Sequence, residues 1–99
     1  MEFIKINKKE NYAILQMDRG KSNPINQQFV DEFIEALNQL MADNEVLGVV
    51  VAGKENFFSA GLDIPELYSY DEAQFDVFWK KFLQMILQLS KFNKPMVAA

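Results

Sequence analysis

The stretch Gly48–Glu66, GVVVAGKENFFSAGLDIPE, decides how the rest of the chain folds. It opens with an apolar run, Val49–Ala52, which is typical of a buried strand. Two phenylalanines, Phe57-Phe58, are expected to bring the chain back inward, and Ser59–Asp63 then makes a corner of small residues. The letters IPEL that follow have the pattern of a helix start, with proline in the first turn.

A strand that ends in such a corner and opens a helix leaves backbone N–H groups without helical partners. These groups, together with the positive end of the helix dipole, suit an anion or a developing oxyanion. The sequence therefore predicts an anion-stabilising corner at Ser59–Asp63.

Within this stretch, the run Phe58-Ser59-Ala60-Gly61-Leu62-Asp63-Ile64 resembles the first oxyanion-hole segment of the enoyl-CoA hydratase/isomerase (crotonase) family. That segment has an aromatic residue, one or two small residues, Ala-Gly, one further residue, Asp and an aliphatic residue. The most similar subtype is the mitochondrial-type 3,2-enoyl-CoA isomerase, which carries a similar FSAGLDL run. The resemblance implies an α/β fold, the N-terminal part of a crotonase-type ββα spiral, with residues 1–99 as one partial, truncated domain.

The resemblance also implies roles at this corner. The backbone N–H of Leu62 would donate to the thioester oxygen of an acyl-CoA and stabilise the charge of the enolate. The surface that meets coenzyme A would include Ser59, Ala60, Gly61, Leu62, Asp63 and Ile64. Without the resemblance, the same residues are what a tight turn requires, and Leu62 is a core side chain.

Asp63 is expected to cap the short helix, with Glu66 completing a capping box, rather than to carry a proton. Glu72 is the other carboxylate close along the chain. Isomerisation needs one base and hydration is usually served by two carboxylates. The resemblance places those carboxylates beyond Ala99, so we expect this chain alone to be inactive.

Two basic residues, Arg19 and Lys21, lie in the loop 19–26, which is rich in turn-forming residues. The resemblance implies that they reach the phosphates of coenzyme A through charge-assisted hydrogen bonds. The alternative is a solvated surface pair. The family usually has Arg-Pro here, whereas this chain has Arg19-Gly20, so the path of the loop is left open.

The first half of the chain predicts a strand–helix–strand unit. Strands at 2–7 and 12–18 should pair as a hairpin. The segment 26–42 has apolar residues at helical spacing, with Asn26 as N-cap and Glu32 among the outward polar residues. The strand at 46–52 should lie parallel to an earlier one.

The second half predicts a long helix over 71–92, with Asp71 and Gln74 at capping-box spacing. Its apolar face is wide and includes Phe75, Phe78 and Trp79, which fit a core better than an acyl pocket. After Lys94-Pro95 a further strand begins at residue 96.

Composition excludes several classes of site. The chain has no Cys and no His, so it cannot form a thiol nucleophile, a Ser-His-Asp triad or a Cys/His metal site. We expect no metal, and no cofactor beyond the coenzyme A of the substrate. A net charge of −4 argues against nonspecific nucleic-acid binding. No apolar run approaches the roughly 20 residues of a membrane span.

We therefore expect a cytoplasmic chain that binds acyl-CoA and neither nucleic acid nor membrane. The resemblance implies a homo-oligomer, because family members commonly form trimers or hexamers. The chain stops inside an apolar run, which predicts a piece of a longer enoyl-CoA isomerase or hydratase. The alternative is a complete small non-catalytic protein that binds or assembles through the apolar face of its last helix.

Overall fold

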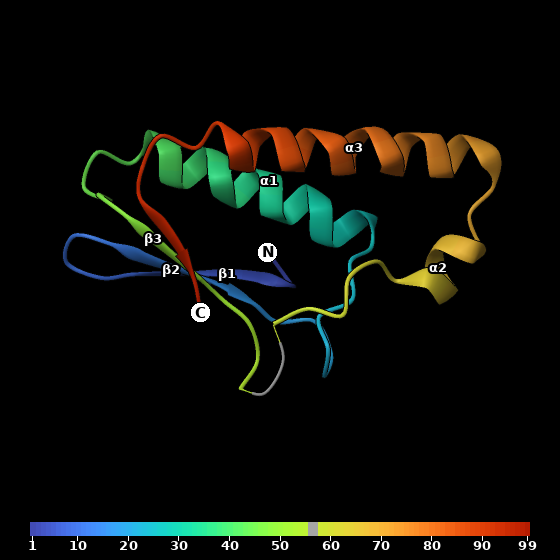
Figure 1. The fold of residues 1–99 in the computed structure, drawn as a ribbon, viewed down its shortest axis with the longest axis horizontal. Helices are drawn as coiled ribbons and strands as arrows, with labels where there is room; N and C mark the ends of the chain where they lie inside the picture. Colours follow the sequence, from blue (N-terminus) through green and yellow to red (C-terminus); the bar gives the residue numbers. More distant parts are fainter. Residues whose placement is uncertain (56–57) are drawn as a thin grey trace.

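The computed structural model describes residues 1–55 and 58–99. In chain order the elements are β1 (Ile4–Lys8), β2 (Ala13–Met17), α1 (Gln27–Ala42), β3 (Val49–Ala52), α2 (Ile64–Tyr68), α3 (Glu72–Ser90) and β4 (Met96–Ala98). The strands form one sheet in the order β1-β2-β3-β4. Helices α1 and α3 lie over one face of this sheet, and α2 lies at the end where both helices begin (Figure 1). The predicted α/β class is confirmed.

The strand pairings also match the predictions. β1 and β2 form an antiparallel hairpin, and β3 runs parallel to β2, with Leu15 opposite Val51. β4 adds to β3 in parallel. β3 begins at Val49, three residues later than predicted, because the chain before it is still turning: the Val46 N–H donates to Asp43 O at 3.1 Å.

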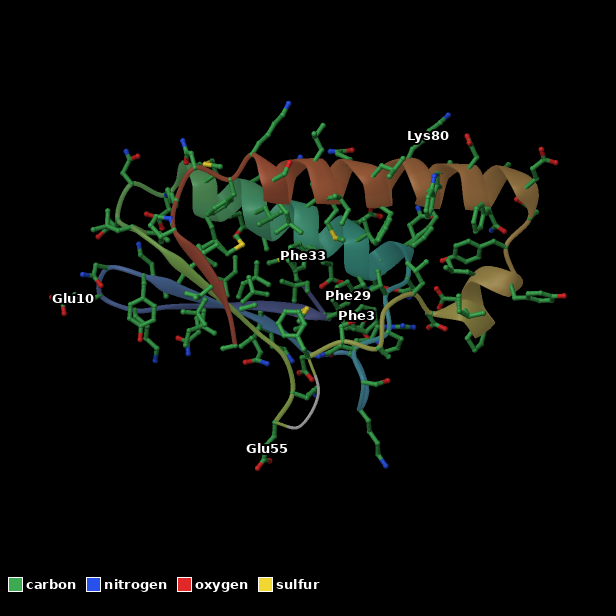
Figure 2. All side chains as sticks on the ribbon, in the orientation of Figure 1. Phe3, Glu10, Phe29, Phe33, Glu55 and Lys80 are labelled. Atoms are coloured by element: carbon green, nitrogen blue, oxygen red, sulfur yellow. The ribbon has the colours of Figure 1, made fainter. Side chains whose placement is uncertain are left out.

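The core lies between α1 and the inner face of the sheet. Asn26 caps α1 as predicted, its side chain accepting from the Phe29 N–H at 2.9 Å. Figure 2 shows Phe29 and Phe33 in the layer between helices and sheet. The alternation along β2 and β3 supplies the other side of this core, namely Ala13, Leu15, Met17, Val49 and Val51.

Glu32 departs from its predicted outward position. The residue is 8% exposed, and its Oε1 accepts from the N–H groups of Phe3 (2.7 Å) and Ile4 (3.1 Å) at the start of β1. Burial raises the pKa of Glu32, but these hydrogen bonds, together with one from Gln28, outweigh it and hold the pKa below its ordinary value. Glu32 therefore joins α1 to β1 as a buried carboxylate.

Helix α3 has the predicted capping box of Asp71 and Gln74. Phe78 is fully buried, as expected of a core residue. Phe75 and Trp79 are 45% and 42% exposed, so the core prediction is wrong for these two. None of the helices in the described ranges is both long and apolar enough to cross a lipid bilayer.

Lys94 holds the end of α3 and the start of β4 against α1. Its Nζ donates to Leu40 O at 2.6 Å and to Asp43 O at 2.7 Å. Leu40 lies in the last turn of α1 and Asp43 is its C-cap, where carbonyl groups lack helical partners and a cation interacts favourably with the helix dipole. Lys94 therefore also joins the segment before β4 to the C-terminal end of α1.

Candidate functional site

The loop after β2 and the segment after β3 meet at one edge of the sheet. This follows from the pairing of β2 and β3, since the carboxyl ends of adjacent parallel strands lie side by side. Beyond the strands, Ile25 and Leu62 form an isolated parallel bridge. The Ile25 N–H donates to Gly61 O at 2.8 Å, and the Asp63 N–H donates to Ile25 O at 2.9 Å.

This bridge decides where the Leu62 N–H points. In a parallel bridge the residues on either side of Leu62 make the hydrogen bonds, so the N–H of Leu62 itself faces away from Ile25. Its neighbours have acceptors: the N–H groups of Ala60, Gly61 and Asp63 donate to Ser22 O (2.7 Å), Ser59 Oγ (3.0 Å) and Ile25 O (2.9 Å). Within residues 1–55 and 58–99, the Leu62 N–H donates to no protein acceptor.

The physical reason for this unpaired donor differs from the one predicted. We expected a helix N-terminus to supply free N–H groups, but α2 has only five residues. The Asp63 carboxylate accepts from the Glu66 N–H at 3.1 Å and so occupies the start of that helix. The donor at Leu62 is left unpaired by the bridge to Ile25, and the helix dipole is a minor contribution.

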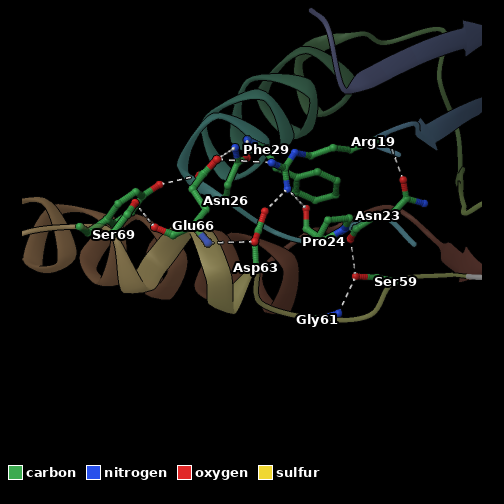
Figure 3. Close-up of polar contacts among 11 residues, drawn as sticks. Arg19, Asn23, Pro24, Asn26, Phe29, Ser59, Gly61, Asp63, Glu66 and Ser69 are labelled. Carbon is green, nitrogen blue, oxygen red and sulfur yellow. Dashed lines mark hydrogen bonds and ion pairs between the residues drawn. The ribbon is translucent and has the colours of Figure 1, made fainter. Parts of the chain in front are cut away.

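Asp63 caps α2 as predicted, and it also forms an ion pair with Arg19. Arg19 Nη1 lies 2.7 Å from Asp63 Oδ2, with the two side chains 17% and 14% exposed (Figure 3). The same Nη1 donates to Pro24 O at 2.8 Å. The hydrogen bond from Arg19 holds the pKa of Asp63 below its ordinary value, although burial opposes it. A carboxylate held in this ionised form is a poor proton carrier.

Glu66 does not complete the predicted capping box. The Asp63 N–H already donates to Ile25 O, so the Glu66 side chain turns elsewhere. Its carboxylate accepts from Asn26 Nδ2 at 3.2 Å and from the Tyr70 hydroxyl at 2.9 Å. Glu66 thereby connects α2 to the cap of α1.

The two basic residues of the loop have different surroundings. The Arg19 guanidinium is engaged with Asp63 and Pro24 O and lies over the Phe3 ring, 5.2 Å from its centroid. Lys21 is exposed on the surface. The predicted contact with coenzyme A phosphates remains a prediction for both, and Lys21 is the one whose side chain faces solvent.

Asn23 is a residue that the sequence reasoning missed. It is fully buried and has a left-handed backbone, with φ of 49°. Its Nδ2 donates to Phe58 O at 2.9 Å, and its backbone O accepts from Ser59 Oγ at 2.8 Å. An Asn before a proline in a polar loop predicts a turn, but not the distant partner of its side chain.

An apolar cavity of about 510 Å³ opens beside Ser59. It lies between the sheet and the helices, and its lining is Met17, Ile25, Phe29, Phe33, Val51, Phe58, Ser59, Met85, Leu89, Met96 and Ala98. Phe75 and Trp79 are absent from this lining. Phe58 is 45% exposed and lines this cavity, and Phe57 lies outside the described residues, so the expectation that the two phenylalanines bring the chain back inward stays a prediction. In the described ranges, no group of three or more carboxylates is arranged to hold a metal ion.

Comparisons with known proteins give a consistent result. The family model described as "Enoyl-CoA hydratase/isomerase" matches residues 7–99. Rat "Enoyl-CoA delta isomerase 1, mitochondrial" is 30% identical over 95 residues, which are 92% of this chain and 33% of that protein. "Probable enoyl-CoA hydratase EchA17" of Mycobacterium tuberculosis is 31% identical over 87 residues, again 33% of its length. The chain thus spans about a third of these curated relatives.

Solved structures show the same fold. An enoyl-CoA hydratase from Geobacillus kaustophilus superposes with a TM-score of 0.91 at 24% identity, covering 99% of this chain and 38% of that one. Pseudomonas aeruginosa DspI gives a TM-score of 0.91 at 21% identity, with 100% and 38% coverage. At these identities the likeness concerns the fold, and it confirms the predicted crotonase-type architecture over the described residues.

Proposed function

Because the chain belongs to the enoyl-CoA hydratase/isomerase family, we propose that the Ser59–Asp63 corner holds the thioester of an acyl-CoA. The Leu62 N–H is one of the donors to the thioester oxygen. The observation that carries this proposal is that the Leu62 N–H, alone among the N–H groups of residues 60–63, has no acceptor among the described residues. A thioester gains negative charge on its oxygen as it becomes an enolate, so a fixed donor stabilises the transition state preferentially.

The corner is also suited to a close approach by coenzyme A. Gly61 has a φ of 90°, which favours glycine, and no atom outside residues 60–62 lies within 4 Å of where its Cβ would be. The backbone of Ser59, Ala60 and Ile64 extends this surface on either side. Lys21, whose side chain is exposed, would meet a phosphate by a charge-assisted contact. The apolar cavity beside Ser59 would take an acyl chain.

The acid–base step needs residues other than those of the corner. Asp63 is paired with Arg19, and Glu66 is bonded to Asn26 and Tyr70, so neither carboxylate is available to move a proton. We propose that this chain binds acyl-CoA and polarises the thioester but does not turn it over. The reaction class, isomerisation or hydration, depends on carboxylates supplied elsewhere in the enzyme. The substrate brings its own coenzyme A, and no other cofactor is required.

The test compares two ligands that differ only at the thioester oxygen. Butyryl-CoA has a carbonyl, and the thioether S-butyl-CoA does not. Calorimetry should give the thioester an affinity about 2- to 12-fold higher, the range for one net hydrogen bond. Replacing the Leu62 amide with an ester removes the N–H and should abolish the difference, whereas Leu62→Ala keeps the N–H and should retain it. Equal affinities in the unaltered chain would contradict the proposal.

A second candidate function is assembly through α3. Several large apolar side chains of this helix are about half exposed, namely Phe75, Val77, Trp79, Leu83, Ile86 and Leu87. Burying such a face between copies of the chain would remove apolar surface from water. Concentration-dependent association that Leu83→Glu abolishes, with no binding of butyryl-CoA, favours assembly. Saturable binding of butyryl-CoA by the monomer favours the enzyme.

A further inference from the structure

Asn23 has an unusual, left-handed backbone conformation that contacts with the surrounding residues stabilise. It is fully buried with φ of 49°, a region that non-glycine residues seldom adopt and that Asn tolerates better than most. Two bonds to Arg19 close this turn: the Asn23 N–H donates to Arg19 O at 3.0 Å, and Asn23 Oδ1 accepts from the Arg19 N–H at 2.7 Å. Such a buried outlier beside a candidate site points to a role at that site.

The other half of the Asn23 amide reaches the corner itself. Asn23 Nδ2 donates to Phe58 O at 2.9 Å, and the Ser59 hydroxyl donates to Asn23 O at 2.8 Å. Ser59 Oγ in turn accepts from the Gly61 N–H at 3.0 Å. Figure 3 shows this chain of contacts from Asn23 through Ser59 to Gly61. Asn23 thus anchors the corner on the side where it arrives from β3.

The peptide group between Gly61 and Leu62 carries the unpaired donor. A trans peptide is planar, so the Gly61 C=O and the Leu62 N–H point in opposite directions. The Gly61 O accepts from the Ile25 N–H at 2.8 Å, and Ile25 is only two residues after Asn23. The segment Asn23–Ile25 therefore fixes this peptide plane from one side and leaves the Leu62 N–H aimed at the other.

We propose that Asn23 is a positioning residue for the Leu62 N–H. On one side of the Gly61–Leu62 peptide group, the Asn23 side chain holds Phe58 O and its backbone O holds the Ser59 hydroxyl, which accepts from the Gly61 N–H. On the other side, the Ile25 N–H holds the Gly61 O. This inference rests on the proposed function of Leu62 as a donor to the thioester oxygen. A donor that is held in place before the ligand arrives needs no reorganisation, and a small misplacement weakens its hydrogen bond steeply.

Two substitutions test the contribution of the Asn23 side chain separately from that of its left-handed backbone. Asn23→Gly keeps the left-handed backbone at low cost but removes both side-chain bonds. Asn23→Asp keeps the acceptor for the Arg19 N–H and replaces the donor to Phe58 O with a carboxylate oxygen. Both variants should lower the affinity for butyryl-CoA by about 2- to 12-fold, to that of S-butyl-CoA. The affinity for S-butyl-CoA should not change.

A matched control distinguishes positioning from general destabilisation. Lys94→Met removes contacts at the far end of α1, about 24 Å along a helix of this length, and lowers stability without touching the corner. This variant should keep the thioester preference of the unaltered chain, that is, its higher affinity for butyryl-CoA than for S-butyl-CoA. If one of the two Asn23 variants does not fold, the other still tests the proposal.

The outcomes separate the two proposals. Loss of the thioester preference in the Asn23 variants, with S-butyl-CoA affinity retained, supports the positioning role. A retained preference, or an equal loss of affinity for both ligands, overturns that role while the donor function of Leu62 stands. No thioester preference in the unaltered chain contradicts the donor function itself, and the positioning role falls with it.

Discussion

Arg19 Nη1 lies 2.7 Å from Asp63 Oδ2, and this mostly buried ion pair joins the loop after β2 to the residue that follows Leu62. The two residues are 44 positions apart along the chain. Their contact, together with the bridge between Ile25 and Leu62, brings the candidate donor to a fixed place at the sheet edge.

Breaking this pair should destabilise the fold. Arg19→Met leaves the Asp63 carboxylate partly buried without its cation, which should lower the free energy of unfolding by about 2–4 kcal/mol. Asp63→Asn should cost less, because Asn still caps α2. Urea unfolding of both single variants and the double variant measures the coupling, expected at about 0.5–3 kcal/mol. Additive effects would show that the pair contributes nothing.

Lys94 should stabilise the C-terminal turn of α1. Lys94→Met keeps most of the aliphatic stem but removes the ammonium from Leu40 O and Asp43 O. We expect a loss of about 1–3 kcal/mol in the free energy of unfolding. Lys91→Met is the control, since Lys91 is exposed and pairs with no carboxylate in the described ranges, and it should change stability by under about 0.5 kcal/mol. Equal effects of the two substitutions would rule out the capping role of Lys94.

Glu32 should make the free energy of unfolding depend on pH. Its folded-state pKa lies below the ordinary value of 4.5, so its contribution is complete above that value and is lost as the pH falls through the lower folded pKa. Asp18, hydrogen-bonded by Lys5 and Lys54, has a pKa lowered to about 2. The free energy of unfolding should therefore keep falling as the pH approaches that value.

Two glutamate-to-glutamine variants isolate the contribution of Glu32 to this dependence of stability on pH. Unfolding followed from pH 6 to pH 2 should show a shallower acid decline for Glu32→Gln than for the unaltered chain. Glu35→Gln, on the exposed face of the same helix, should keep the original decline. If Glu32→Gln retains the full decline, the buried carboxylate is not its source.

Lys21 should contribute to binding through the phosphates of coenzyme A. Lys21→Gln should weaken butyryl-CoA binding by about 1.4- to 5-fold, the range for an exposed ion pair, and the effect should shrink with added salt. Binding of S-butyryl-pantetheine, which has no phosphate, should not change. Lys9→Gln, in the exposed turn between β1 and β2, is the control. An equal loss for both ligands would place Lys21 against another part of the ligand.

The fold followed from local patterns wherever those patterns were strong. Apolar spacing over 26–42 and the caps at Asn26 and Asp71 predicted α1 and the start of α3. The alternation in the two N-terminal strands predicted the hairpin. These signals lie within a few residues of one another, so a single sequence carries them.

What the sequence did not predict depends on contacts between distant segments. Glu32 reads as an outward residue because helical spacing does not show the unpaired N–H groups at the start of β1. The pairing of Glu66 with Asn26 and Tyr70 similarly replaces the capping box that local spacing predicted. The apolar pattern of α3 does not show which of its residues α1 covers.

The most direct test of the central claim observes the Leu62 N–H itself. A ¹H–¹⁵N spectrum of the chain, titrated with butyryl-CoA and separately with S-butyl-CoA, reports whether this group gains an acceptor. We predict a downfield proton shift of the Leu62 amide with the thioester that the thioether does not produce. Identical responses to the two ligands, or no response at Leu62 under saturating butyryl-CoA, would contradict the account.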